Sequence, residues 1–590
     1  MQNPTRLFDF PYYQMEKFPL KLMMKSLGDS TEEYSSQSFI EQMNKASRGL
    51  LAKGVQPSDK IGLISHNNRC EWNVMDQGIL QIGAIDVPIY PTMSPEDIQY
   101  ILNHAEVKLC FVSNEELFHK VQSIKSQVPT LKEVYTFEKV NGAPNWHDVL
   151  NASGDVAQEK VDEIAAGIKP EELATLIYTS GTTGLPKGVM LSHHNICTNA
   201  IDSSERVPTL YAGKSRCLSF LPVCHIFERM LHYMYMYNGV SIYFGQSLET
   251  IKEDLQASRP HMFTGVPRLF EKFFDGIVAK GAAAGGIKSK LFAWAVATAL
   301  QWEPDGKNGG WYEFKINLAR KLVFSKVKEA LGLTEIAGVA SGSAALQAKL
   351  ARFFNGAGIP LLEGYGLTET SPVISVNTIN QPGMIKVGTV GKIISNVKVK
   401  IAADGEILCS GPNVMMGYYK DPERTADVLK DGWFHTGDIG ELDGDGFLKI
   451  TDRKKEIFKT SGGKYIAPQI VENALKESIF VEQCIVVGEG KNFPSALIVP
   501  SFDALRTWCE KHGISYTSDK EMVQNQKIID RVQKDVDKAN ERFGKWEQVK
   551  KFTLLPELWT IEADELTPTL KLKRKQIHQR YASQIEALYS

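Results

Sequence analysis

The 590-residue sequence predicts an α/β protein with a large N-terminal domain and a smaller α+β C-terminal domain. Over the first ~130 residues, helix-like segments alternate with short apolar runs, a pattern typical of helix-covered sheets. The chain is too long to form one hydrophobic core. Near residues 452–456 the composition turns charged, and a separate series of helices and strands follows. We therefore predict domains at residues 1–452 and 453–590.

The N-terminal elements follow from side-chain periodicity. Apolar residues at 39, 40, 43, 46, 50 and 51 have helical spacing, and residues 61–64 then form a strand-like apolar run. Ser94 and Pro95 mark the start of a second helix, because serine caps a helix N-terminus and proline suits its first turn. Residues 108–112 predict the next strand.

Later segments continue this pattern with one interruption. Residues 273–331 are mostly helix-like and contain a flexible Gly/Ala stretch at 281–286, which predicts a helical insertion. After residue 456 the pattern predicts a helix at 468–478 and strands at 484–487 and 496–499. Further strands are expected at residues 173–177, 239–244, 397–401 and 405–408.

Composition excludes several classes of protein. Hydrophobic residues make up 43% and charged residues 23%, as in ordinary globular proteins, and a net charge of −2 gives no electrostatic case for nucleic acid. The eight cysteines form no CxxC pair, which favours reduced intracellular thiols over a zinc site or disulfides. The longest apolar run, residues 291–300, is too short to span a bilayer, and the N-terminus lacks the pattern of a secretory signal. We expect a cytoplasmic protein with at most peripheral contact with the inner face of a membrane.

The most informative segment is the loop at residues 178–188, which follows the predicted buried strand at 173–177. Its small hydroxyl residues and glycines allow backbone N–H groups to surround an anion, and Lys187 adds a positive charge. The order Pro186-Lys187 differs from that of a P-loop, and such a stretch in isolation is usually a surface turn. The candidate phosphate ligands are Thr179, Ser180, Gly181, Thr182, Thr183, Gly184 and Lys187.

Three further motifs favour phosphate binding by this loop over a simple surface turn. Residues 363–370 place glycines around an aromatic ring, where a planar base can lie against ring and backbone, and add Glu369, a hard oxygen ligand for Mg²⁺. Residues 433–438 end in Asp438, whose carboxylate can accept two hydrogen bonds from ribose. Residues 566–575 are basic; we expect residues 573–575 to form a solvated face and consider Lys571 separately.

In this order and spacing, from about residue 38 to about residue 580, the motifs resemble the adenylate-forming superfamily of acyl-CoA synthetases, luciferases and peptide adenylation domains. The resemblance implies a β-barrel-like subdomain in the large domain and a small mobile C-terminal domain. It implies that Tyr365 packs on adenine, that Thr368 contacts phosphate, and that Glu369 and Thr179 hold Mg²⁺. The other implied ATP-binding residues are Gly342, Glu363, Gly364, Gly366, Asp438 and Arg453.

Other motifs point to the long-chain fatty acid–CoA ligase branch. Residues 221–229 and 265–272 resemble that branch, and His225 is implied to lie near the acyl carboxylate, although a lone histidine among apolar residues is more often structural. Lys571 matches the lysine that acts in adenylation; Leu570 replaces the glycine that often precedes it, as in the long-chain form. Lys455 falls at the implied hinge (residues 453–456), and Ser461, Gly462 and Gly463 match the loop for CoA.

The resemblance implies an acid–thiol ligase that uses Mg²⁺, with fatty acid, ATP and CoA as substrates. Fatty acid and ATP would give acyl-AMP and pyrophosphate, and CoA would then give acyl-CoA and AMP. Two alternatives stay open: a fatty acyl-AMP ligase that loads a carrier protein, and a catalytically silent regulator that binds lipid or nucleotide. No nucleic-acid partner and no transmembrane segment are expected, and a homodimer is left open.

Overall fold

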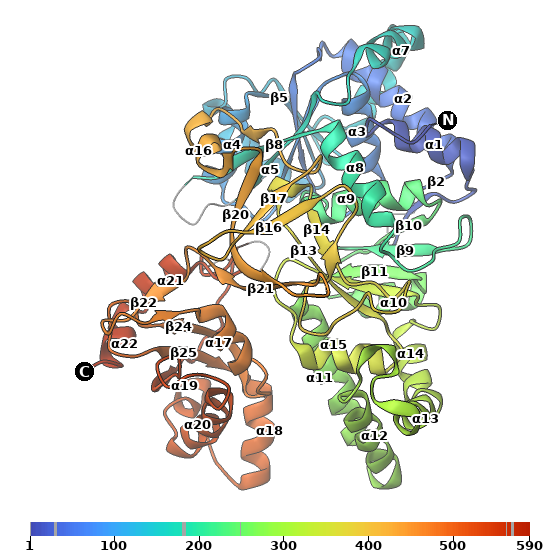
Figure 1. Cartoon of the computed structure of the whole chain (residues 1–590). Coiled ribbons are helices and arrows are strands. Elements are labelled where there is room, and N and C mark those ends of the chain that lie inside the picture. Colours follow the sequence, from blue (N-terminus) through green and yellow to red (C-terminus); the bar gives the residue numbers. More distant parts are fainter. Residues whose placement is uncertain (1, 29–31, 180–184, 248, 562, 568–570) are drawn as a thin grey trace. The chain divides into compact units, whose positions relative to one another are not determined.

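The computed structural model describes residues 2–28, 32–179, 185–247, 249–561, 563–567 and 571–590 (Figure 1). The chain divides into two compact units, and strands and helices occur in both, so the predicted α/β class is confirmed. One unit comprises residues 1–399, 409–434 and 444–448, and the other comprises residues 400–408, 435–443 and 449–590. A single boundary at residue 453 stays a prediction.

The first sheet of the larger unit has seven strands in the order β18-β8-β7-β4-β3-β5-β6. Its central strands β4, β3 and β5 are parallel, whereas β7 and β8 form an antiparallel hairpin. The strands are β3 (Lys60–Ile64), β4 (Ile85–Ile89), β5 (Val107–Val112), β6 (Glu133–Thr136), β7 (Leu173–Thr179), β8 (Lys187–Ser192) and β18 (Gly417–Tyr418). The helices of this part are α1 (Asp9–Lys17), α2 (Ser36–Ala52), α3 (Cys70–Gln81), α4 (Pro95–Ala105), α5 (Glu115–Ile124), α6 (His147–Asn151) and α7 (Gln158–Gly167).

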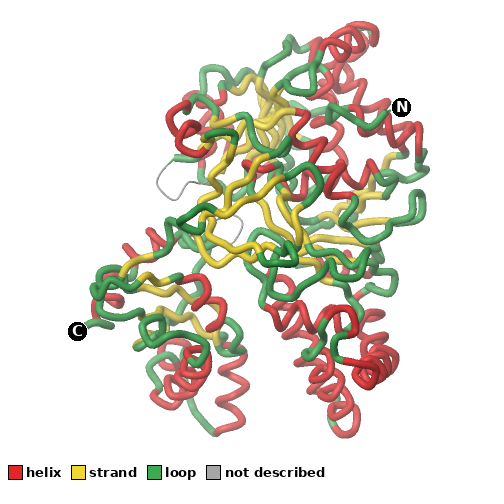
Figure 2. The backbone as a smooth tube through the Cα atoms, in the orientation of Figure 1, coloured by secondary structure: helices red, strands yellow, loops and turns green. Residues whose placement is uncertain are grey.

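Local sequence explains these elements well. The hydroxyl of Ser94 accepts a hydrogen bond from the N–H of Asp97 at 3.1 Å, so it caps α4 as predicted. Helix α2 buries Phe39, Met43 and Leu50 on one face, as the apolar spacing indicated. Figure 2 shows the strands as yellow layers flanked by red helices.

The second sheet has nine strands in the order β15-β14-β13-β12-β11-β9-β10-β1-β2. Strands β9 to β13 run parallel to their neighbours in this sheet, and β14 turns back antiparallel to β13. The strands are β1 (Met24–Ser26), β2 (Glu33–Tyr34), β9 (Arg216–Ser219), β10 (Ser241–Phe244), β11 (Met262–Gly265), β12 (Gly338–Ser341), β13 (Leu361–Gly366), β14 (Val373–Val376) and β15 (Lys392–Ile393). Helices α8 (His193–Ser204), α9 (Ile226–Tyr237), α10 (Ile251–Ser258) and α15 (Ala348–Gly356) lie between them in sequence.

The segment predicted as a helical insertion is helical. It contains α11 (Pro267–Ala283), α12 (Gly286–Ala299), α13 (Gly309–Ala319), a π-helical turn (Arg320–Phe324) and α14 (Ser325–Leu331). The Gly/Ala stretch was expected to be flexible throughout, but α11 extends to Ala283 and only the following residues leave the helix. These helices share a core with α15, in which phenylalanines such as Phe274, Phe324 and Phe353 pack together.

A five-stranded sheet is formed by residues 398–453 and has strands in both units. Its order is β16-β17-β20-β19, with β21 beside β20. The elements are β16 (Lys398–Ile401), β17 (Glu406–Ser410), α16 (Pro422–Val428), β19 (Leu429–Lys430), β20 (Trp433–Leu442) and β21 (Leu448–Arg453). The turn at residues 443–446 joins β20 to its neighbour β21. Closure of this sheet into a barrel stays a prediction.

The C-terminal residues form an α+β unit, as predicted. A three-stranded sheet in the order β24-β25-β26 separates two apolar clusters, one of which contains the apolar face of α20. The elements are β22 (Phe458–Lys459), β23 (Tyr465–Ile466), α17 (Pro468–Leu475), β24 (Val481–Val487), β25 (Ser495–Pro500), α18 (Phe502–His512), α19 (Asp519–Met522), α20 (Gln526–Asn540), β26 (Lys551–Leu554), α21 (Arg574–Arg580) and α22 (Ala582–Ala587).

Candidate functional site

The larger unit brings three side chains from distant parts of the sequence into one charged cluster. The Lys187 ammonium lies 2.7 Å from a Glu369 carboxylate oxygen and donates to the Tyr418 hydroxyl at 2.7 Å. Tyr418 in turn donates to Glu369 at 2.9 Å. Burial alone would raise the pKa of the Glu369 carboxyl, but the charge and hydrogen bond of Lys187 hold that pKa below its ordinary value. Glu369 is therefore ionised at neutral pH, as a ligand for a cation must be.

Thr179 lies on the strand next to Lys187. It pairs with Lys187 in the register of the β7–β8 hairpin. Within the described part of the chain, its buried hydroxyl has no hydrogen-bond partner, so this oxygen can serve an added ligand. The other predicted phosphate ligands of this loop, Ser180, Gly181, Thr182, Thr183 and Gly184, lie outside the described residues.

The donor set in this cluster fits a magnesium–phosphate complex. Glu369 and Thr179 offer hard oxygen ligands, and Lys187 offers charge to phosphate. Among the residues that the structure describes, no group of three or more His, Cys, Asp or Glu side chains could hold a metal ion. The remaining ligands of an ion here would have to come from phosphate or water, as is usual for Mg²⁺ bound with a nucleotide.

The motif at residues 363–370 forms the end of β13 and the turn into β14. Tyr365 pairs with Ser375 and is partly buried against the core. A Cβ on Gly364 would lie 3.3 Å from Val376, whereas a Cβ on Gly366 would lie only 1.9 Å from the Pro372 carbonyl oxygen. Glycine at position 366 is thus required by the close approach of two backbone segments.

Replacing Gly366 by alanine should lower the free energy of unfolding by about 3 kcal/mol, because the methyl group would force backbone apart. Gly462→Ala is the matched control, since no atom lies within 4 Å of the position of its Cβ, and it should change stability by less than about 0.5 kcal/mol. Urea denaturation of both variants measures the difference. Equal stability of the two variants would contradict the steric explanation.

Thr368 and Glu363 complete this motif. Thr368 is buried in the 3₁₀ turn Thr368–Thr370 that presents Glu369. The Glu363 carboxylate accepts a hydrogen bond from the Leu346 N–H at 3.0 Å, so it secures the loop that contains Gly342. Burial raises the pKa of Glu363 to about 8, with the Leu346 N–H opposing the shift. This contact gives Glu363 a structural role that the motif alone did not indicate.

Gly342 lies against the motif at residues 221–229, which contains His225. A Cβ at Gly342 would lie 3.2 Å from the Phe227 ring, two residues after His225. His225 is the N-cap of α9, and its Nδ1 accepts a hydrogen bond from the Phe227 N–H at 3.2 Å. Gly342, an implied ATP-binding residue, and the motif that contains His225 therefore meet in the fold.

A buried polar side chain from the loop after β3 holds the motif at residues 221–229 in position. Asn68 donates to the Ser219 hydroxyl and to the Leu221 carbonyl at 2.7 Å each, and accepts from the Val223 N–H at 3.0 Å. The next residue, Arg69, is fixed in turn: it forms ion pairs with Glu71 at 3.1 Å and Glu138 at 3.0 Å.

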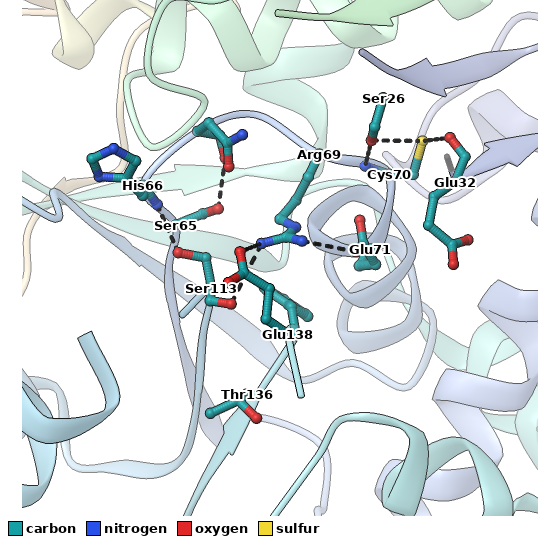
Figure 3. A network of polar contacts seen from close by, with 12 residues as sticks. Ser26, Glu32, Ser65, His66, Arg69, Cys70, Glu71, Ser113, Thr136 and Glu138 are labelled. Carbon is teal, nitrogen blue, oxygen red and sulfur yellow. Dashed lines mark hydrogen bonds and ion pairs between the residues drawn. The ribbon is translucent and has the colours of Figure 1, made fainter. Parts of the chain in front are cut away.

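Figure 3 shows that the Arg69 network gathers residues from the ends of three neighbouring strands. Arg69 follows β3, Ser113 follows β5, and Glu138 follows β6. Ser113 accepts hydrogen bonds from Arg69 through its carbonyl and from the His66 N–H through its hydroxyl. The network satisfies polar groups at the carboxyl ends of these strands, so we assign it a structural role.

Helix α9 carries two more buried polar residues that sequence reasoning missed. Glu228 accepts a hydrogen bond from Thr264 of β11 at 2.8 Å. Arg229 pairs with Asp76 at 2.7 Å and Asp86 at 3.0 Å, and donates to Thr175 at 2.8 Å. Burial raises the pKa of Asp86 to about 7, against the charge of Arg229. These contacts tie α9 to both sheets. The only signal in the sequence was a pair of charged residues in a mostly apolar stretch after His225.

Burial raises the pKa of Glu228 from 4.5 to about 7, while burial and the charge of Arg229 lower that of His232 to about 3. Below pH 4.5 Glu228 is protonated in folded and unfolded chains. As the pH rises to 7 only the unfolded chain loses the proton, so wild-type stability falls. Glu228→Gln does not titrate and should gain about 3 kcal/mol relative to wild type between pH 5 and pH 8.

Urea denaturation of wild type and Glu228→Gln at both pH values tests this expectation. The exposed Glu116→Gln variant is the control and should follow wild type at both pH values. A difference between wild type and Glu228→Gln that does not change with pH would contradict the assigned titration.

The smaller unit holds the predicted ribose ligands. Arg453 Nε lies 3.2 Å from the buried Asp438 carboxylate. Glu406, which the sequence motifs did not include, accepts hydrogen bonds from the Gly437 N–H at 2.9 Å and from the Lys454 ammonium at 2.9 Å. Glu406 thus fixes the backbone of β20 next to Asp438.

The remaining predicted residues lie on turns of the same unit. Lys455 is exposed in the turn between β21 and β22. Ser461, Gly462 and Gly463 form an exposed turn between β22 and β23, where the Ser461 hydroxyl donates to Asn492 at 2.7 Å. Gly463 has a φ of +79°, which favours glycine.

Lys571 contacts Thr567 through its backbone. Its carbonyl accepts from the Thr567 N–H at 2.8 Å, and its N–H donates to the Thr567 hydroxyl at 3.0 Å. The prediction that residues 573–575 form a solvated face is wrong for Arg574. Its guanidinium is largely buried and binds Glu472 through two hydrogen bonds of 2.8 and 2.7 Å, and Glu456 at 2.9 Å. Bidentate pairing compensates for burying this charge.

Comparison with known proteins assigns the chain to a family. Residues 13–419 match the family model of AMP-binding enzymes, and residues 455–590 match that of the AMP-binding enzyme C-terminal domain. The chain belongs to the AMP-binding enzyme family.

Its relatives in this family share sequence over most of their length. It is 36% identical to the long-chain-fatty-acid–CoA ligase FadD15 of Mycobacterium bovis, covering 93% of this chain and 91% of that protein. It is 33% identical to the human long-chain-fatty-acid–CoA ligase 1, covering 95% and 83%.

Solved structures share the fold at lower identity. The anthranilate CoA ligase AuaEII matches with a TM-score of 0.72 and 19% identity, covering 99% of this chain and 98% of that one. The A-PCP didomain of carboxylic acid reductase from Segniliparus rugosus matches with a TM-score of 0.73 and 20% identity, covering 100% and 83%. At these identities the likeness shows the fold alone.

Proposed function

We propose that this AMP-binding enzyme is an ATP-dependent long-chain fatty acid–CoA ligase. The observation that carries the proposal is identity of 30–36% with long-chain-fatty-acid–CoA ligases over most of the chain. The cluster of Lys187, Glu369 and Tyr418 supports it, because it offers a cation and an ionised carboxylate. The Thr179 hydroxyl, on the strand paired with Lys187, has no hydrogen-bond partner among the described residues. The first step is attack of a fatty carboxylate on the α-phosphate of ATP, giving acyl-AMP and pyrophosphate.

In this step Lys187 and the residues around Thr179 bind phosphate, and Tyr365 packs on the base. Glu369 and Thr179 would hold Mg²⁺, which supplies positive charge to the phosphates when it is bound. Asp438 and Arg453 bind the ribose, His225 lies by the carboxylate, and Lys571 neutralises charge that develops on the α-phosphate. In the second step the CoA thiol, admitted by residues 461–463, attacks the acyl-AMP carbonyl, and AMP leaves.

Lys455 is proposed as the hinge between these steps. Proline fixes φ, whereas a hinge residue must change its backbone torsions, so Lys455→Pro should slow thioester formation about tenfold or more while adenylation changes little. Single-turnover measurements of acyl-AMP and acyl-CoA separate the two steps. Lys455→Ala, which removes only the charge, is the control. Equal losses in both half-reactions of the proline variant would count against the hinge.

The proposed activity is tested by pyrophosphate release with Mg·ATP across acetate, octanoate, palmitate and oleate. The assay is run with and without CoA, and acyl-CoA is identified by mass. CoA-dependent turnover that peaks with palmitate or oleate supports the proposal. Trapped acyl-AMP without thioester would favour a ligase that loads a carrier protein, and silence with every acid would favour a regulator.

A further inference from the structure

The helical segment after α11 carries an unusual second apolar face. On α13 and the π-helical turn that continues it, Trp311, Phe314, Leu318 and Leu322 recur at intervals of three or four residues. Trp311 is 72% exposed and Phe314 58% exposed, and their rings stack with centroids 5.5 Å apart. Large apolar side chains gathered in this way on a surface usually mark a binding surface.

The exposure of this face does not come from a poorly packed helix. The opposite side of α13 buries Tyr312, Ile316 and Ala319 in the core shared with α15. The neighbouring helix α12, which packs against α13, repeats the arrangement. It buries Ala295 and Ala299 and exposes the apolar residues Ile287, which is 85% exposed, and Leu291. We call the six exposed residues the apolar face: Ile287, Leu291, Trp311, Phe314, Leu318 and Leu322.

The segment that carries the apolar face is positively charged. Residues 286–331 contain eight Lys or Arg and four Asp or Glu, a net charge of +4 in a chain whose net charge is −2. Lys288, Lys290 and Lys321 are exposed on the same two helical segments. Two of the four acidic residues are engaged within the protein: Glu303 pairs with Arg352 at 2.6 Å, and Asp305 accepts from the Gly383 N–H at 3.1 Å. The charge facing outward is therefore mainly positive.

We propose that the apolar face docks on the surface of an anionic lipid bilayer. Aromatic and leucine side chains enter the boundary between headgroups and acyl chains, and lysines beside them bind the lipid phosphates. In the described parts of the chain, no helix combines the length and apolar character needed to cross a bilayer. Contact through this face is therefore contact at one leaflet. Figure 1 shows α12 and α13, in green, at one end of the larger unit.

This surface gives the proposed ligase a route to its substrate, and in that respect the inference rests on the proposed function. Long-chain fatty acids partition into bilayers because each methylene favours an apolar environment by ~0.8 kcal/mol. Docking at the bilayer surface brings the enzyme to the phase that holds the acid. Binding to vesicles needs neither ATP nor CoA, so it can be measured whether or not the ligase activity is confirmed.

The test is cosedimentation of the full-length protein with vesicles of phosphatidylcholine alone and of phosphatidylcholine with phosphatidylglycerol. Wild type should pellet with the anionic vesicles. Trp311→Ala/Phe314→Ala should bind them at least about tenfold more weakly, since it loses most of the exposed aromatic area. Lys288→Gln/Lys290→Gln should bind about fivefold more weakly for each lysine removed, and its binding should depend less steeply on salt than that of wild type.

Tyr211→Ala is the matched control, because Tyr211 is an exposed aromatic residue (64%) outside this segment, and it should bind as wild type does. Thermal unfolding of each variant verifies that the fold is kept. Wild-type protein that stays in the supernatant, or equal binding by Trp311→Ala/Phe314→Ala, would overturn the proposal. Dimers in sedimentation velocity that this double variant abolishes, without binding to vesicles, would assign the apolar face to a second copy of the chain instead.

Discussion

Lys571→Ala is expected to slow acyl-AMP formation by about 10²- to 10³-fold, the effect of removing a charge that acts on the transition state. The fold should survive, because two hydrogen bonds join the backbone of Lys571 to Thr567 and neither uses the ammonium. Attack of carboxylate on the α-phosphate adds negative charge there, which a positioned ammonium stabilises. Pyrophosphate release with palmitate measures this step directly.

Two comparisons make the experiment specific for Lys571. Lys575→Ala removes an exposed lysine four residues away and should leave the rate within a factor of about two, as surface substitutions usually do. Acyl-CoA formation from synthetic acyl-AMP should be retained by Lys571→Ala, because that step involves no attack at phosphorus. Adenylation at the wild-type rate in Lys571→Ala would show that another group performs this role.

Glu369→Gln should lower the rate of adenylation by about 10²-fold or more and raise the Mg²⁺ concentration needed for half-maximal rate. Glutamine keeps the shape of the side chain but removes the charge that holds both Lys187 and a cation. In the present structure Lys187 lies 2.7 Å from Glu369, so the loss also leaves this ammonium without its counter-charge. Pyrophosphate release at several Mg²⁺ concentrations separates lost metal binding from lost turnover.

Tyr418→Phe is the matched variant for this cluster. It removes the hydroxyl that bridges Lys187 and Glu369 and leaves both charges in place. We expect a loss of no more than about tenfold and an unchanged Mg²⁺ requirement, because one neutral hydrogen bond contributes about 1 kcal/mol. A Glu369→Gln variant with the same Mg²⁺ requirement as wild type would contradict the assignment of Glu369 as a metal ligand.

Much of the architecture was predictable from local patterns. The apolar spacing at residues 39–51, the cap at Ser94 and the apolar runs of β3, β5 and β7 each specify an element through interactions within a few residues. The motifs around Lys187, Glu369 and Asp438 were predicted in the same way, because short stretches of sequence carry their chemistry. Their roles in catalysis stay predictions until the variants are measured.

The residues that the sequence did not indicate are those whose partners are remote in the chain. Tyr418 lies 49 residues from Glu369 and 231 from Lys187, yet it binds both. Glu406 and Glu228 resemble ordinary surface carboxylates until the fold buries them beside Gly437 and Thr264. Arg574 belongs to a basic run, and only the tertiary structure brings Glu472 to it, 102 residues away.

The sequence by itself thus determined the α/β class, the order of the motifs and the chemistry they can offer, since helical and strand periodicity and side-chain type are local properties. The tertiary structure decided which charges are paired, which carboxyls are buried with raised pKa values, and that α12 and α13 present an apolar face as well as a core. Burial and pairing depend on contacts between segments that are distant in the chain. A pattern of apolar residues also does not reveal which apolar side chains stay exposed to solvent after neighbouring helices have packed.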